Sequence, residues 1–275
     1  MKPYTYHTHT TFCDGKCSVE EMIEGAIALG CDAIGFSSHS LTEFDESYCM
    51  PKSRTEEYRR TVRDAAEKYK DKIKVHLGIE VDIFSDVEYY SKGFDYIIGS
   101  AHNITDGQEF YSVDASEEQF LKNVNELFGG DFYAYCEEYF KVASTICERI
   151  DCDIIGHIDL VTKFNEGGRY FSESHPRYLA AAKKAVDKLC ESGAIFEINT
   201  GAISRGYRKT PYPSREILKY IKEKGGRVTY SSDCHHKDGI LCGYNEAVKY
   251  ARECGFEGFM KLDGDRFVLV PFDEK

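Results

Sequence analysis

Two histidines separated by one residue lie near the start of the chain, in the β-rich run 4–9 that ends His7-Thr8-His9. In an extended segment the side chains at positions i and i+2 point to the same side. His7 and His9 are therefore expected to present two imidazoles to one point in space. Two imidazoles on one face can hold a divalent metal ion. The pair alone gives weak support, because this spacing also occurs by chance.

The same arrangement recurs along the chain, as an apolar run that ends in a histidine, a glutamate or an aspartate. The further runs are 34–39, 75–80, 96–102, 154–157 and 228–235. This repetition favours a metal site over chance. The other histidines, His76, His175 and His236, lie at positions that favour ordinary structural roles.

The elements that would position these residues alternate between strands and helices. Strands are predicted at 4–9, 32–38, 74–80, 95–100, 153–157, 194–199 and 227–232. Helices are predicted at 18–30, 55–69, 117–128, 131–149, 177–192, 214–224 and 244–253, and Ser18 with Glu21 forms a capping box. Loops are predicted at 40–54, 103–115, 158–175 and 201–213, and short closing strands at 258–261 and 266–270. Polar residues gathered where strands end predict an α/β barrel with its active site at the carboxyl ends of the strands.

The bulk properties restrict the possible functions. The chain has 275 residues with a net charge of −12 and no basic stripe, which disfavours a nucleic-acid partner. No apolar run is long enough to span a membrane, and the N-terminus lacks a signal-peptide core, so a cytoplasmic location is expected. The 11 cysteines are scattered and are expected to be reduced thiols. A single domain over 1–275 is predicted.

The ordered motifs resemble those of the PHP (polymerase and histidinol phosphatase) family. They are His7-Thr8-His9, Ser38-His39, Glu80, His102, Gly156-His157-Ile158-Asp159 and Ser232-Asp233-Cys234-His235. The resemblance implies a distorted (βα)7 TIM-like barrel that binds two or three divalent metal ions at the carboxyl ends of its strands. Imidazole and carboxylate ligands suit Zn, Mn or Fe alike.

The resemblance also implies a ligand set for each ion. One ion would be held by His7, His9, Glu80 and Asp233. Glu80 would bridge to a second ion held by His102 and His157. A third would be held by His39 and His235, with Asp14 as the candidate for its remaining ligand. Asp14 could equally shape a Cys-Asp-Gly turn.

A carboxylate such as Glu80 can hold two cations roughly 3.5–4 Å apart. A water between them becomes hydroxide near neutral pH and can attack phosphorus in line with the leaving alkoxide. We therefore expect hydrolysis of a small phosphate ester. The predicted catalytic residues are Glu80, Asp233 and Asp159, the last as one candidate general acid beside His39 and His235.

The loop 199–214 resembles the histidinol-phosphatase branch of the family. Arg205 is the main candidate for binding phosphate, since a guanidinium binds phosphate oxygens bidentately, although it could be a solvated loop cation. Lys163 and Arg208 are secondary candidates, and Glu43 or Asp159 could accept the amino or imidazole end of the substrate. The expected activity is metal-dependent hydrolysis of L-histidinol phosphate to L-histidinol and phosphate, in histidine biosynthesis. The alternatives are a PHP phosphoesterase for another phosphomonoester or a nucleotide, and a non-catalytic metal-binding scaffold.

Overall fold

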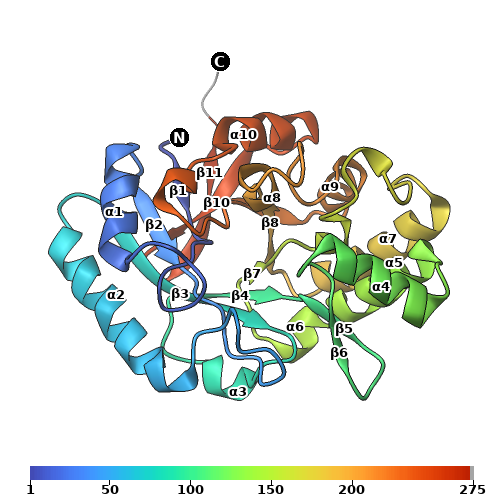
Figure 1. The fold of residues 1–275 in the computed structure, drawn as a ribbon. Helices are drawn as coiled ribbons and strands as arrows, with labels where there is room; N and C mark the ends of the chain where they lie inside the picture. The colour runs from blue at the N-terminus through green and yellow to red at the C-terminus, as the bar shows by residue number, and fades with distance from the viewer. Residues whose placement is uncertain (273–275) are drawn as a thin grey trace.

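The protein is described by a computed structural model covering residues 1–272 (Figure 1). The strands are β1 (Tyr4–Thr5), β2 (Ala33–Phe36), β3 (Lys74–Asp82), β4 (Tyr96–Ser100), β5 (Asn103–Thr105), β6 (Phe110–Ser112), β7 (Ile154–Ile155), β8 (Ile195–Asn199), β9 (Arg227–Ser231), β10 (Gly258–Asp263) and β11 (Arg266–Pro271). The α-helices are α1 (Val19–Ala28), α2 (Thr55–Tyr69), α3 (Val87–Tyr90), α4 (Glu117–Phe128), α5 (Phe132–Ala143), α6 (Ile146–Arg149), α7 (Pro176–Cys190), α8 (Gly201–Ser204), α9 (Arg215–Glu223) and α10 (Tyr244–Glu253). The predicted single domain over 1–275 extends beyond the described residues.

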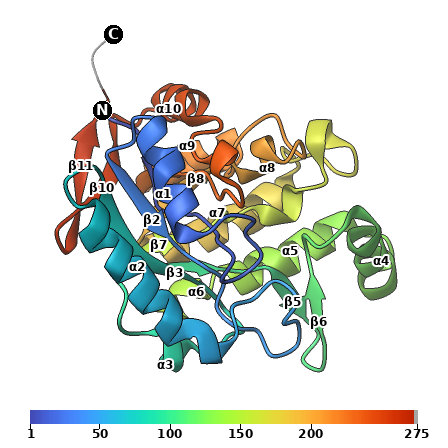
Figure 2. The same ribbon diagram turned by 60° about the vertical axis from the view of Figure 1, so that its left-hand side comes forward.

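Seven parallel strands form one curved sheet in the order β1-β2-β3-β4-β7-β8-β9. The first and last strands approach each other where Thr8 makes a parallel bridge with Cys234, so the sheet is a nearly closed barrel. Helices α1 and α2 lie outside the first strands, and α5, α7 and α9 cover the other side (Figure 1, Figure 2). The predicted seven-stranded α/β barrel is confirmed.

The strands form because short apolar runs are buried on both faces, as parallel strands in an α/β fold must be. Ile98, Ile154 and Ile195 lie in register across β4, β7 and β8, and all three are buried. The helices are amphipathic, and α1 buries Val19, Met22, Ile23 and Ala26. The predicted capping box of Ser18 and Glu21 is present at the start of α1. The core therefore lies between the helices and the strands, and the strand ends are left for polar residues.

The structure corrects several parts of the prediction, and the predicted loop 201–213, for example, begins with the short helix α8. The predicted loop 103–115 contains the antiparallel hairpin β5–β6, which turns through residues 106–109. The Asp106 carboxylate accepts two backbone N–H groups and Gly107 has φ +94°, both typical of a tight turn. The predicted helix 131–149 is divided into α5 and α6, since the hydroxyls of Ser144 and Thr145 bond to carbonyls of the preceding turn.

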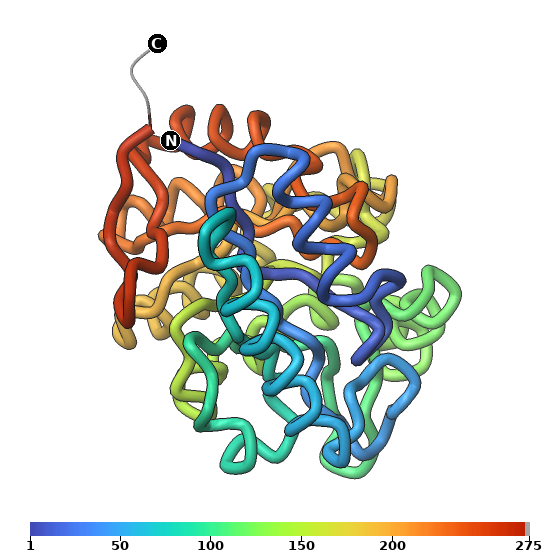
Figure 3. The backbone as a smooth tube through the Cα atoms, turned by 90° about the vertical axis from the view of Figure 1, so that its left-hand side faces the viewer, coloured from blue at the N-terminus to red at the C-terminus, as the bar shows by residue number. Residues whose placement is uncertain are grey.

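Strands β10 and β11 form a separate antiparallel hairpin rather than joining the barrel sheet. The hydroxyls of Tyr4 in β1 and Thr229 in β9 both donate to the carbonyl of Met260 in β10. The hairpin therefore covers the junction between the first and last barrel strands, and Figure 3 shows it beside the N-terminal segment. Within residues 1–272, no helix combines the length and the apolar character that crossing a bilayer requires.

Candidate metal centre

The carboxyl ends of the barrel strands bring together the nine predicted metal ligands. Their nitrogen and oxygen atoms form four overlapping groups, and within each group these atoms lie within 4.8 Å of one another. The groups are His9, Asp14, His39 and His235; His7, His9 and Asp233; His7, Glu80 and His157; and His39, Glu80 and His102. Residues more than 200 positions apart in the sequence thus meet at one end of the barrel.

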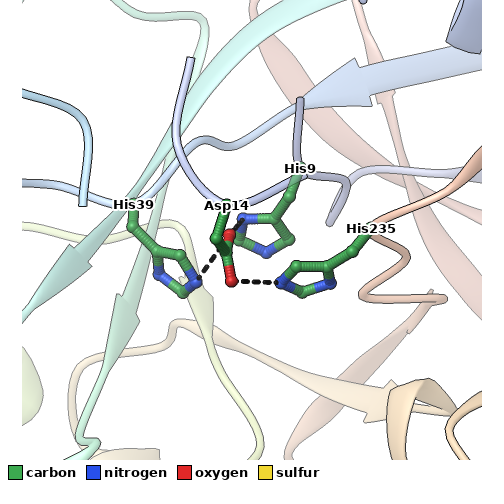
Figure 4. A group of neighbouring side chains, drawn as sticks. All are labelled: His9, Asp14, His39 and His235. Atoms are coloured by element: carbon green, nitrogen blue, oxygen red, sulfur yellow. Dashed lines mark ion pairs between the residues drawn. The ribbon is translucent and has the colours of Figure 1, made fainter. Parts of the chain in front are cut away.

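Asp14 lies between three imidazoles (Figure 4). Its Oδ2 is 3.2 Å from Nε2 of His235, and its Oδ1 is 3.8 Å from Nε2 of His39 and 3.9 Å from Nδ1 of His9. The loop can return Asp14 to this position because Gly15 follows it: a Cβ at Gly15 would overlap the backbone of His9. Asp14 therefore lies with His39 and His235, its predicted partners, and with His9 as well.

Glu80 lies at the centre of the cluster with its carboxylate 1% exposed. Its Oε2 is 2.8 Å from Nδ1 of His39 and 3.1 Å from Nε2 of His7. Its Oε1 is 3.2 Å from Nε2 of His157 and 3.4 Å from Nε2 of His102. Because its two oxygens face different histidine pairs, Glu80 has the arrangement expected of a carboxylate that bridges two cations.

Several donor atoms of the cluster fit bound metal ions better than they fit a metal-free interior. Nε2 of His7, Nε2 of His9, Oδ1 of Asp14 and Oε2 of Glu80 are buried, and although they lie close to other charged groups, none makes a hydrogen bond with a described residue. Burying such atoms without partners costs free energy. A divalent cation would satisfy them, and nitrogen with oxygen donors suits zinc, manganese or iron.

Two carboxylates that the sequence analysis missed orient the imidazoles. Glu197 contacts Nδ1 of His7 through Oε2 at 2.9 Å, and its Oε1 accepts the backbone N–H of His157 at 2.7 Å. Asp82 contacts Nδ1 of His102 at 2.9 Å. A carboxylate on Nδ1 fixes the tautomer and leaves Nε2 free for a metal. The alternation of side chains along a strand could have indicated both carboxylates, because residues two apart face the same side. Asp82 lies two residues after the predicted ligand Glu80, and Glu197 lies two residues before Asn199, the last residue of β8.

The electrostatics of three groups, Asp233, Glu80 and His9, favour their ligand-competent protonation states. Burial raises the pKa of Asp233, but Arg205 and His7 outweigh this effect and hold that pKa well below its usual value. Burial also opposes ionisation of Glu80, yet the surrounding histidines lower its pKa well below the usual value. Burial, together with His235 and His39, lowers the pKa of His9 to about 3. Ionised carboxylates and a neutral His9 are the forms that bind metal.

A cavity of about 500 Å³ opens onto the cluster. Two cationic side chains predicted to bind phosphate, Arg205 and Lys163, line it together with His39, His102 and His235. The Arg205 guanidinium donates to the Asp233 carbonyl at 2.8 Å and to its Oδ2 at 3.1 Å. Nζ of Lys163 lies 3.1 Å from Oδ2 of Asp114. The cavity thus places two cationic side chains, each paired with an aspartate, beside the metal-ligand cluster.

The structure does not bring three other predicted site residues to this cavity. Arg208 is only 6% exposed and pairs with Glu173 at 2.7 Å. Glu43 is exposed and lines a different hollow. Asp159 is fully buried, where its Oδ2 accepts the backbone N–H of Ser214 at 2.7 Å and burial raises its pKa to about 7. These placements argue against substrate contacts by all three and against Asp159 as the general acid.

Comparisons with known proteins agree with this fold. The PHP domain model matches residues 5–201. A Schizosaccharomyces pombe protein named as a probable histidinol-phosphatase is 25% identical, over 95% of this chain and 90% of its own length. The histidinol-phosphatase of Bacillus subtilis is 23% identical, over 86% of this chain and 95% of its own length.

One solved structure is a histidinol phosphate phosphatase from Lactococcus lactis in complex with Zn, L-histidinol and phosphate. It superposes with a TM-score of 0.74 at 21% identity, covering 97% of this chain and 99% of that one. At this identity the likeness shows the shared barrel fold. The family match itself spans most of the sequence, including the strands that deliver His7, Glu80 and His157. The chain therefore belongs to the PHP family.

Proposed function

We propose that this protein is a metal-dependent phosphomonoesterase that hydrolyses L-histidinol phosphate to L-histidinol and inorganic phosphate, as a step of histidine biosynthesis. The observation that carries the proposal is that the cluster of imidazoles and carboxylates shares one cavity with Arg205 and Lys163. Relatives named histidinol-phosphatases, and the Lactococcus lactis structure with Zn, L-histidinol and phosphate, support the choice of substrate.

The proposed ligands follow the grouping of the side chains. His7, His9, Glu80 and Asp233 would hold one ion, and Glu80 with His102 and His157 a second; Asp14, His39 and His235 would hold a third. Two or three ions of Zn, Mn or Fe fit this set. When bound, such ions neutralise the charge of phosphate oxygens and lower the pKa of water.

The protein's own side chains place the phosphate. One edge of the Arg205 guanidinium is held by Asp233, and its Nη1 also lies 3.3 Å from Nδ1 of His235. In the proposed function, its other N–H groups donate to phosphate oxygens. Lys163 adds a second positive charge to the same cavity. Asp233 therefore links the proposed metal site to phosphate binding. Separately, the Glu197 carboxylate bonds to Nδ1 of His7 and keeps the imidazole oriented toward the cluster.

The remainder of the cavity fits a cationic leaving group. Asp45, Ser47 and Tyr48 line it beside the histidines and offer oxygen atoms to an ammonium or imidazolium group. L-Histidinol carries both groups. A small-molecule phosphomonoester is therefore the proposed partner, in the cytoplasm, and the net charge of −12 argues against nucleic acid.

The test is a comparison of kcat/KM for L-histidinol phosphate with values for other phosphomonoesters, nucleotides and phosphodiesters, using metal-loaded protein. The proposal predicts that L-histidinol phosphate is the best substrate and that phosphodiesters are not turned over. A higher kcat/KM for a nucleotide would replace this substrate with another. No turnover of any phosphate ester would leave the metal-binding scaffold as the explanation.

A further inference from the structure

Two chain segments meet beside the cavity, and each carries one of its cations. We call residues 200–214 the arginine segment, because it contains Arg205, and residues 157–175 the lysine segment, because it contains Lys163. The arginine segment follows β8, and the lysine segment follows β7. The arginine segment returns to β8 where Tyr212 bridges to Asn199, and between these points its position also depends on its contacts with the lysine segment.

An ion pair between a buried arginine and a partly exposed glutamate joins the two segments. Arg208 in the arginine segment donates to both carboxylate oxygens of Glu173 in the lysine segment, at 2.7 and 3.2 Å. It also donates to the carbonyl of Thr162 at 2.8 Å, next to Lys163. The Arg208 side chain is 5% exposed, and Asn165 donates to the same Glu173 at 3.2 Å. A guanidinium held by three bonds allows little freedom to the residues around it.

Two further contacts extend this connection. At the end of the arginine segment, the backbone N–H of Ser214 donates to the buried Oδ2 of Asp159 at 2.7 Å. Between these points, the backbone N–H of Lys209 donates to Glu166 at 3.0 Å. The segments are thus joined at residues 208, 209 and 214, while Arg205 lies a few residues before these contacts and faces the cavity.

An ion pair that is largely buried adds little net stability, because the cost of removing its charges from water offsets their attraction. Its effect is to favour one arrangement over others, since separating the partners leaves a buried charge unpaired. Here the arrangement that it favours places Arg205 and Lys163 at one cavity. Neither Arg208 nor Glu173 lines that cavity.

We propose that Arg208, Glu173 and Asp159 are positioning residues that hold Arg205 where it binds the substrate phosphate. They act through Arg205 and contact no substrate atom. This inference rests on the phosphate contact of Arg205 in the proposed function.

The test is the dissociation constant of inorganic phosphate, measured by calorimetry on the zinc-loaded protein. Losing a charge-assisted hydrogen bond from a displaced Arg205 should raise this constant about tenfold in Arg208→Met. Arg208→Lys keeps the charge and one contact, so its value should lie between those of Arg208→Met and the unchanged protein. The matched control is Arg177→Met, which removes an exposed arginine bonded to Asp131 and Glu137 elsewhere. The control should bind phosphate normally, and all three variants should retain their zinc.

The decisive comparison uses Arg205→Ala with and without Arg208→Met. If Arg208 acts through Arg205, Arg208→Met should weaken phosphate binding no further once Arg205 is absent. Full additivity of the two losses would overturn the inference, and so would normal phosphate binding in Arg208→Met or Arg205→Ala. If Arg208→Met does not fold, Glu173→Gln removes the same ion pair and should give the same non-additive result. Failure to hydrolyse L-histidinol phosphate, with these binding results intact, would refute the proposed function but leave the positioning role standing.

Discussion

Glu197 gives a direct test of how the barrel prepares its metal ligands. Its Oε2 lies 2.9 Å from Nδ1 of His7, and its Oε1 accepts N–H groups from His157 and Asn199, each at 2.7 Å. In Glu197→Gln the side-chain oxygen can keep the latter two bonds. The amide NH₂ would then face Nδ1 of His7 and would favour the tautomer with its proton on Nε2. That proton occupies the nitrogen that points at Glu80 and the metal cluster.

The expected loss is a factor of about 10–100 in metal affinity, which is typical when a carboxylate behind a metal-binding histidine is changed. This range corresponds to roughly 1.4–2.8 kcal/mol. The assay is a zinc titration in competition with a chromophoric chelator, with the loss of kcat measured in parallel. Because Glu197 is fully buried, thermal unfolding should be recorded for the metal-free and the zinc-loaded variant.

Glu137→Gln is the matched control, since it makes the same chemical change in an exposed pair with Arg177. It should leave zinc affinity unchanged. A Glu197→Gln protein that folds and binds zinc as tightly as the control would refute the reasoning, because the orientation of His7 would then not depend on Glu197.

Three further outcomes are expected. The substitution Glu80→Gln keeps the shape of the side chain but removes the negative charge that faces both histidine pairs, so kcat should fall roughly 10³-fold. A kcat near that of the unchanged protein would exclude a bridging role for Glu80. Gly156→Ala would place a methyl group against the hydroxyl of Ser100, which donates to Glu80 at 2.7 Å. We therefore expect the free energy of unfolding in urea to fall by about 1–3 kcal/mol and zinc binding to weaken. An unfolding midpoint and zinc affinity equal to those of the unchanged protein would contradict this. Zinc binding near pH 7 should release protons from His7 and His102. Burial lowers the pKa of both imidazoles, but Glu80 and neighbouring carboxylates outweigh burial and raise both pKa values well above the usual value. Apparent zinc affinity should therefore increase with pH, and calorimetry in buffers of different ionisation enthalpy would detect the protons; a binding enthalpy independent of the buffer would contradict it.

The barrel and its metal cluster could be predicted from sequence because both depend on local patterns. Each strand is a short apolar run, and parallel strands end at the same edge of the sheet. The position of a residue after its strand therefore indicated that His39, His102 and His157 would meet. The turn at Asp106-Gly107 also carried a local signal for the β5–β6 hairpin, which the prediction of a loop overlooked.

Contacts between loops could not be predicted in the same way. Arg208 and Lys163 both looked like candidates for phosphate, but only the folded chain shows that Glu173 binds the first and that the second lines the cavity. Asp159 lies two residues after His157, yet its side chain contacts the backbone of Ser214 rather than the cavity. Such choices depend on how segments distant in sequence pack, and the spacing of residue types does not contain that information.

The central claim is that separate strands deliver His7, Glu80, His157 and Asp233 to one group of catalytic metal ions. The most direct measurement is the metal content per chain, determined by elemental mass spectrometry. Metal content and activity on L-histidinol phosphate are both measured before and after chelation. We predict more than one equivalent of transition metal in the active protein, loss of activity when the metal is removed, and recovery when it is restored. Full activity in a preparation without metal would contradict the account.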